Sequence, residues 1–189
     1  ESRVVAALQD QIGESFFKAS EMMLACEGHV LTSGSGTSHT IAARFAHLLS
    51  CVGTPAQYIH PSDSLHGTSG AVTAKDVVFF VSKGGETTEV NGLAKIAKAR
   101  GAKVICIVEN PASTLAGLSD IVLCVQAPAE ADIYGMISLG SSMFNAALCD
   151  ALCAALLEMR GYTRDEFGET HPGGAVGIKL QNEEKPQNH

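Results

Sequence analysis

The sequence predicts an α/β fold, a three-layer sandwich in which a five-stranded parallel sheet is flanked by helices. The expected strands are unbroken apolar runs rather than alternations of polar and apolar residues, which is typical of strands buried on both faces. They alternate with segments of helical periodicity, and parallel strands need such crossover connections. A length of 189 residues suits one domain of this class.

The first half of the chain is expected to contain two helices and two strands. Apolar residues recur at helical spacing over residues 3–27. The short apolar segment 29–33, bounded by glycines, predicts the first strand. Residues 38–51 are expected to form a helix that Ser38 caps at its N-terminus. A second short strand is expected at 56–60.

The second half continues the alternation and ends in the longest helix. The run DVVFFVS at 76–82 predicts the third strand, and a helix is expected over 86–100, directly before a glycine. The fourth and fifth strands are expected at 103–108 and 120–125, with a short helical turn between them. The Ala-rich apolar segment 138–160 predicts a long helix.

The chain shows no internal repeat, low-complexity tract or clear linker. Residues 1–180 are therefore expected to form a single domain. The last nine residues, 181–189, have the polar sequence QNEEKPQNH and are expected to be a disordered tail.

Composition argues against several classes of partner. The formal net charge of −7 disfavours nucleic acid, because binding a phosphate backbone needs a clustered basic surface. No stretch approaches about 18 uninterrupted apolar residues, so no membrane partner is expected. None of the six cysteines forms a C-x-x-C pair, and several lie in apolar runs, which predicts reduced core residues and a cytoplasmic protein.

A loop rich in glycine and hydroxyl groups follows the first strand. It reads GSGTS over residues 34–38 and contains Gly36, Thr37 and Ser38. Glycines let a backbone approach a ligand closely, and the free amides of a helix N-terminus favour an anion. The loop is not a dinucleotide fingerprint, because His39 stands at the third glycine position. Taken alone, it could equally be a simple tight turn.

A second loop of this kind, SKGGETTE, follows the third strand. The carboxyl ends of parallel strands share one edge of a sheet, where ligands bind. The two loops are therefore expected to form a cradle for one phosphate group, with no metal. Of Glu86 and Glu89, one is expected merely to favour the helix N-terminus through the helix dipole. The candidate phosphate-binding residues of this second loop are Ser82, Gly84, Gly85 and Thr87.

Three further loops carry ionisable side chains. His66 lies in a loop without hydrophobic pattern, and His171 precedes a rigid Pro-Gly-Gly turn. Glu130 and Asp132 follow the fifth strand, so a carboxylate there could face the same pocket. Histidine titrates near physiological pH and a pocket carboxylate can act as a base. Chance surface histidines and a purely structural turn remain the alternatives.

Three motifs, in the order GSGTSHTIA, VSKGGETTEV and ETHPGGAVGIKL, resemble the SIS (sugar isomerase) domain family. The stretch IHPSDSLHGTSG also resembles the HP-x-x-x-x-HG-x-x-G loop of its arabinose-5-phosphate isomerase branch, with the capsule and sugar-alcohol relatives. The resemblance implies a flavodoxin-like SIS fold, no cofactor and aldose–ketose isomerisation, by analogy between D-arabinose 5-phosphate and D-ribulose 5-phosphate. The paired cystathionine-β-synthase-type domains that commonly follow in this branch are not in the 189 residues.

The resemblance also implies roles for individual residues. Ser38, Ser82 and Thr87 would hold the phosphate of a phosphorylated sugar. His171 would act across a subunit boundary, so the resemblance implies a homo-oligomer, a dimer or tetramer, whose sites are completed by a neighbouring chain. The positions that line the family's catalytic pocket are matched here by His66, Glu89, Glu130 and His171.

Two residues depart from the family's pattern. Where the isomerases have G-x-G-K-S, this chain has Thr37, so the lysine expected beside the substrate is missing. Gly84 stands where many SIS domains carry serine. Both changes remove contacts to a substrate, which leaves the exact sugar and turnover itself open.

The hypothesis for the chemistry is a cis-enediol route. Glu89 or Glu130 would carry the proton between C2 and C1, and His171 or His66 would assist proton transfer at the oxygen atoms. One competing hypothesis is a sugar-phosphate sensor without catalysis. The other is a metalloenzyme that uses His60, His66 and His171, although their spacing matches no defined metal motif.

Overall fold

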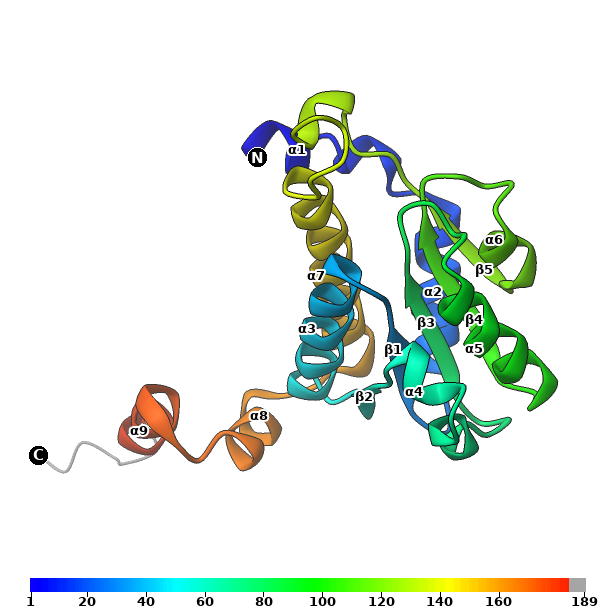
Figure 1. Ribbon diagram of the computed structural model, residues 1–189. Coiled ribbons are helices and arrows are strands. Elements are labelled where there is room, and N and C mark those ends of the chain that lie inside the picture. The colour runs from blue at the N-terminus through cyan, green and yellow to red at the C-terminus, as the bar shows by residue number, and fades with distance from the viewer. Residues whose placement is uncertain (184–189) are drawn as a thin grey trace, which may run out of the picture.

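The computed structural model describes residues 1–183 and has an α/β domain with a helical arm at its C-terminal end (Figure 1). Its five strands are all parallel and lie in the order β2-β1-β3-β4-β5. The predicted sheet is confirmed, and each strand falls within its expected range. The strands are β1 (Val30–Ser33), β2 (Ala56–Tyr58), β3 (Val77–Val81), β4 (Lys103–Val108) and β5 (Ile121–Cys124).

Helices cover both faces of the sheet, as the three-layer prediction requires (Figure 1). Three of them, α2, α3 and α7, lie on one face, and α5 and α6 lie on the other. The helices are α1 (Ser2–Ala6), α2 (Glu14–Leu24), α3 (Thr37–Cys51), α4 (Pro61–Ser64), α5 (Thr88–Ala99), α6 (Thr114–Leu118), α7 (Gly140–Arg160), α8 (Arg164–Thr170) and α9 (Gly174–Glu183). Single 3-10 turns are η1 (Gln9–Gln11), η2 (Thr68–Ala71) and η3 (Ala129–Ala131).

Two apolar cores explain why the strands are unbroken apolar runs. Successive side chains of a strand point to opposite faces. On β3, Phe79 packs against Phe45 of α3, with the ring centroids 4.9 Å apart, in the core that also contains Phe144 of α7. Its neighbour Phe80 enters the opposite core with Leu93 of α5. All five side chains are buried, so a polar side chain on either face of β3 would lose its hydration.

The expectation of one N-terminal helix over 3–27 is wrong. The segment forms α1, the turn η1 and α2 instead. Ile12 is extended (ψ 112°), and Gly13 precedes α2 in a β conformation. Glycine loses more conformational freedom in a helix than alanine does, so the chain leaves the helix there although the apolar spacing continues.

Ser38 does not cap α3, which corrects a second expectation. The helix begins one residue earlier, at Thr37, and Gly36 occupies the N-cap position with φ 59°. This left-handed conformation favours glycine, and it turns the chain from β1 into α3 within three residues. Ser38 therefore lies inside the first helical turn.

Helix α7 is long and apolar enough to cross a membrane by length and composition alone. Nine of its residues are buried, and several, such as Phe144 and Leu152, belong to the core beside the sheet. Its Asp150 also pairs with Arg44 of α3, with Nη2 and Oδ2 3.0 Å apart. These contacts are those of a core helix of the domain.

The C-terminal arm consists of α8 and α9 and extends from the end of α7 (Figure 1). Thr163 and Glu166 form a capping box at the start of α8, which the sequence analysis did not predict as a helix. Helix α9 continues to Glu183, so the expected tail is helical over residues 181–183. The rest of that tail, 184–189, lies outside the described residues.

Candidate functional site

The first candidate loop lies against the end of a neighbouring strand. A Cβ atom at Gly34 would come within 2.7 Å of the Ser38 carbonyl oxygen and 3.0 Å of the Val81 carbonyl oxygen. Val81 is the last residue of β3, and the second candidate loop begins directly after it. The two loops therefore adjoin at the carboxyl edge of the sheet, as the sequence predicted.

Tyr58 of β2 binds the first loop, and His39 of α3 contacts Tyr58. Tyr58 Oη donates to the Gly34 carbonyl at 3.0 Å, and His39 Nδ1 lies 2.8 Å from the same Oη. A phenol has one proton, and a carbonyl can only accept. His39 Nδ1 therefore carries a proton and donates to Tyr58. Burial, ahead of the negative charge of Asp63, raises the pKa of Tyr58 to about 12, so the phenol stays protonated.

Internal hydrogen bonds fix the second loop. Ser82 Oγ accepts the Gly85 amide at 3.2 Å, and Asn91 of α5 donates to the Gly85 carbonyl at 3.2 Å. Glu86 accepts both the amide and the hydroxyl of Thr114, at 2.8 and 2.7 Å. Glu86 therefore ties this loop to the start of α6, and these hydrogen bonds lower the pKa of its carboxyl. Glu86 thus has a structural role at the start of α6, whereas Glu89 lies in the first turn of α5, where the helix dipole favours a carboxylate.

We expect the substitution Gly85→Ala to destabilise the fold. Gly85 has φ 70°, and a Cβ atom there would lie 2.2 Å from Ser113 Oγ. Strain of this kind costs about 1–3 kcal/mol. Gly84→Ala is the matched control, because a Cβ atom there would meet nothing within 4 Å and the φ of Gly84 is not positive. Urea unfolding measures both variants, and equal free energies of unfolding would contradict the prediction.

A narrow crevice opens between the two loops and the start of α7. It has a volume of about 20 Å³, enough for roughly one water molecule. A larger ligand would therefore have to bind at its mouth. Hydroxyl groups and one ammonium group dominate its lining, which is Thr37, Ser38, Ile41, Lys83, Ser138, Ser141, Ser142 and Asn145.

Asp132 is the buried anion beside this crevice. Its carboxylate accepts the amide and hydroxyl of Ser141, at 3.0 and 2.6 Å, and the Lys83 ammonium donates to it at 2.6 Å. Burial alone would raise the pKa of Asp132, but the hydrogen bonds from Lys83 and Ser141 outweigh it and hold the pKa at about 2. Asp132 is therefore ionised at neutral pH and is poorly suited to proton transfer.

Sequence reasoning missed two charged residues of this site. Lys83 lies in the second loop, where only its neighbours were expected to bind phosphate, and Glu109 directly follows β4. The Glu109 carboxylate lies 4.0 Å from the Lys83 ammonium. Burial raises the pKa of Glu109 more than the positive charge of Lys83 lowers it. Their positions at the ends of β3 and β4 could have marked both residues as candidates.

The four candidate catalytic residues occupy separate elements. Glu89 is exposed in the first turn of α5, and Glu130 is exposed in η3. His66 is exposed and lies two residues after the end of α4. Leu65, between α4 and His66, packs over Gly92 of α5. Within residues 1–183, no hydrogen bond or ion pair joins any two of the four.

His171 lies far from the crevice of its own chain. Ser141, at the start of α7, lines the crevice, whereas the arm begins after the other end of this helix. A helix of 21 residues is about 30 Å long. The imidazole of His171 stacks on Phe167, with the ring centroids 3.8 Å apart, and its Nδ1 lies 3.0 Å from the Phe167 carbonyl oxygen.

The histidines do not form the metal site considered from the sequence. His60 precedes α4, His66 follows it, and His171 is on the arm. In the part of the chain that the structure describes, no three His, Cys, Asp or Glu side chains are grouped closely enough to hold a metal ion together.

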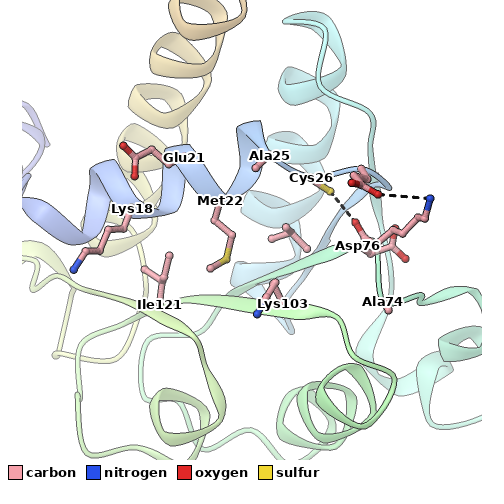
Figure 2. Close-up of a pocket in the computed structure, with 12 residues that line it drawn as sticks. Lys18, Glu21, Met22, Ala25, Cys26, Ala74, Asp76, Lys103 and Ile121 are labelled. Atoms are coloured by element: carbon pink, nitrogen blue, oxygen red, sulfur yellow. Dashed lines mark hydrogen bonds and ion pairs between the residues drawn. The ribbon is translucent and has the colours of Figure 1, made fainter.

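A larger cavity, whose lining residues Figure 2 shows, lies at the amino edge of the sheet. It has a volume of about 750 Å³ and lies between α2 and the amino ends of β3 and β4, with Met22 and Cys26 in its wall. Several of its charged groups are already engaged: Lys75 pairs with Glu27 at 3.6 Å, and Asp76 binds the backbone amide of His29 at 2.8 Å. Ligands of open parallel sheets bind at the carboxyl edge, so the crevice is the better candidate.

Known proteins resemble this chain in both sequence and structure. A family model described as the SIS domain matches residues 23–155. Arabinose 5-phosphate isomerase KdsD of Yersinia pestis is 38% identical over 176 residues, which cover 93% of this chain and 54% of that protein. The chain thus spans about half the length of the curated relatives it matches.

Two solved structures have the same fold over nearly their whole length. A candidate sugar-phosphate isomerase of Listeria monocytogenes superposes with a TM-score of 0.87 at 32% identity, covering 91% of each chain. An Escherichia coli CFT073 protein in complex with arabinose 5-phosphate gives a TM-score of 0.82 at 30% identity. That match covers 88% of this chain and 90% of the other.

Proposed function

Because the chain belongs to the SIS domain family, we propose that it is a sugar-phosphate isomerase that interconverts an aldose phosphate and a ketose phosphate. The observation that carries this proposal is the meeting of two glycine- and hydroxyl-bearing turns at the carboxyl edge, where Gly34 lies against Val81. Free backbone amides and hydroxyl groups at helix N-termini suit a phosphate group. The candidate residues for it remain Gly36, Thr37, Ser38, Ser82, Gly84, Gly85 and Thr87.

The proposed substrate pair is D-arabinose 5-phosphate and D-ribulose 5-phosphate. The curated relatives are named for arabinose 5-phosphate, and a solved neighbour was obtained in complex with that sugar phosphate. Those names support the isomerase over the non-catalytic sensor that the sequence left open. The cytoplasm stays the expected compartment.

The proposed chemistry runs through a cis-enediol. A carboxylate removes the proton from C2 of the open-chain aldose and returns it to C1, while a second group moves the proton between the two oxygen atoms. Glu89 and Glu130 are the candidate bases, because Asp132 is held ionised by Lys83 and Ser141. His66 and His171 are the candidates for proton transfer at oxygen. A fixed phosphate provides binding energy that positions the remote reacting carbons.

We propose further that the site is completed by a second copy of the chain. The arm carries His171 away from its own crevice, so we assign its role at the crevice to the arm of a neighbouring subunit. Exposed apolar side chains beside the crevice support such a partner, because a large apolar patch on a surface marks an interaction site. They are Ile133, Tyr134, Met136, Ile137, Leu139 and Met143.

Mixing two inactive variants tests this assembly. The first variant is Glu89→Gln or Glu130→Gln, whichever loses more turnover, and the second is His171→Ala; each should have little activity alone. In a mixed dimer, one of the two sites then receives both native residues, so random mixing should recover up to about a quarter of the wild-type activity. The mixture is assayed after co-refolding, and co-refolded wild type provides the reference. If co-refolding recovers no activity, then His171 does not act across subunits.

Proton exchange in heavy water tests the function itself. The wild-type protein is incubated with a panel of aldose and ketose phosphates in D₂O, and deuterium at C2 is read by NMR. Incorporation into D-arabinose 5-phosphate is expected, even where net conversion is slow. Binding of pentose phosphates without any exchange would instead favour a sensor.

A further inference from the structure

Lys83 is the one basic residue in the two candidate loops, residues 34–38 and 82–89. Both loops otherwise offer only neutral donors and carboxylates. A sugar phosphate is a dianion near neutral pH, and an ammonium group forms stronger hydrogen bonds to it than neutral donors do. The position of this single cation therefore bears directly on how the site binds phosphate.

The side chain of Lys83 spans the space between the loops. It leaves the end of β3 and lines the crevice together with Thr37 and Ser38 of the first loop. Its ammonium and the hydroxyl of Ser141 bond to the same Oδ2 atom of Asp132, each at 2.6 Å. The ammonium thus lies where the first loop, the second loop and the start of α7 meet.

The ammonium of Lys83 is fixed in place and still accessible. An ammonium has three N–H donors. Asp132 takes one of them, and the Glu109 carboxylate, at 4.0 Å, is beyond hydrogen-bond distance. The Lys83 side chain is 39% exposed, whereas that of Asp132 is 2% exposed. The hydrogen bond to Asp132 raises the pKa of Lys83, so the group stays charged.

We propose that Lys83 is the cation that binds the phosphate group of the substrate, and that Asp132 holds it at the mouth of the crevice. This inference rests on the proposed function. Lys83 replaces, from the adjoining turn, the lysine that the family resemblance expects at position 37. The buried carboxylate fixes the long lysine side chain before the ligand arrives, which lowers the entropy lost on binding.

Calorimetric titration with D-arabinose 5-phosphate and with inorganic phosphate tests this role. Lys83→Gln should weaken binding of both ligands by roughly 10- to 100-fold, as expected for a hydrogen bond to a charged group. Lys95→Gln is the matched control, because it removes the same charge from the exposed side of α5. Thr37→Lys in the Lys83→Gln background should restore part of the affinity, since it returns a cation to the crevice lining.

A second variant separates binding from folding. Lys83→Gln leaves the Asp132 carboxylate without its cation, so the double variant K83Q/D132N removes the pair together. We expect the double variant to bind as weakly as Lys83→Gln. Native affinity in either variant would overturn the role of Lys83 and leave the proposed function standing. A wild type that binds the sugar phosphate without converting it would contradict only the isomerase, and one that binds neither ligand would overturn both proposals.

Discussion

Replacing the proton-transferring carboxylate by an amide is expected to lower kcat by about 100- to 10,000-fold, the usual contribution of a positioned general base. The variants are Glu89→Gln and Glu130→Gln, and the larger loss identifies the base. Affinity for the sugar phosphate should change little, because neither carboxylate is among the candidate phosphate-binding residues. Steady-state kinetics and deuterium exchange at C2 measure the loss.

Glu86→Gln is the matched control for this prediction. It makes the same substitution three residues before Glu89 in the chain, at a carboxylate that binds Thr114 at the start of α6. We expect it to retain the wild-type kcat. If Glu89→Gln and Glu130→Gln together retained full turnover, neither carboxylate would be the base and the enediol mechanism as assigned would fail.

Asp132→Ala is expected to destabilise the fold by about 2–4 kcal/mol. The substitution removes hydrogen bonds to a charged group and leaves the amide of Ser141 without its acceptor, and each loss of this kind costs about 1–3 kcal/mol. Ser141 is 3% exposed, so water cannot easily replace the missing partner. Asp132→Asn keeps an acceptor for that amide and should lose less. Urea unfolding at neutral pH compares the two variants.

The stability that Asp132 provides should also depend on pH. Its pKa is lowered from 3.8 to about 2 in the folded protein, so the unfolded chain binds a proton more readily. The resulting stabilisation is present above about pH 4 and is lost as the pH falls through about 2; it amounts to about 2 kcal/mol. Unfolding curves of the wild type should therefore weaken across this window more than those of Asp132→Asn. Parallel curves would show that Asp132 is not held ionised.

The sheet could be predicted from the sequence because burial on both faces leaves a simple signal, as in DVVFFV at β3. The break at Ile12 and Gly13 could not, since the apolar spacing runs on through it and only the local backbone departs from a helix. The helix α8 was missed for the opposite reason. Its sequence RDEFGET has little apolar periodicity, and its start depends on the capping box at Thr163.

The two candidate phosphate-binding turns could be proposed from glycine and hydroxyl content, because their position after β1 and β3 brings them to one edge. The role of Lys83 could not be predicted in this way. Its partner Asp132 is 49 residues away in the chain, and only the folded structure brings the two side chains to 2.6 Å. Sequence also could not separate Glu86 from Glu89, since both precede or begin the same helix.

The length of α7 has a consequence for how activity would respond to protein concentration. Because this helix keeps each arm away from the crevice of its own chain, a subunit dissociated from the proposed oligomer would bind the sugar phosphate yet lack the imidazole of His171. Specific activity would then fall on dilution, while the affinity of the separated chain for phosphate would persist. Turnover would thus be limited by self-association at low abundance.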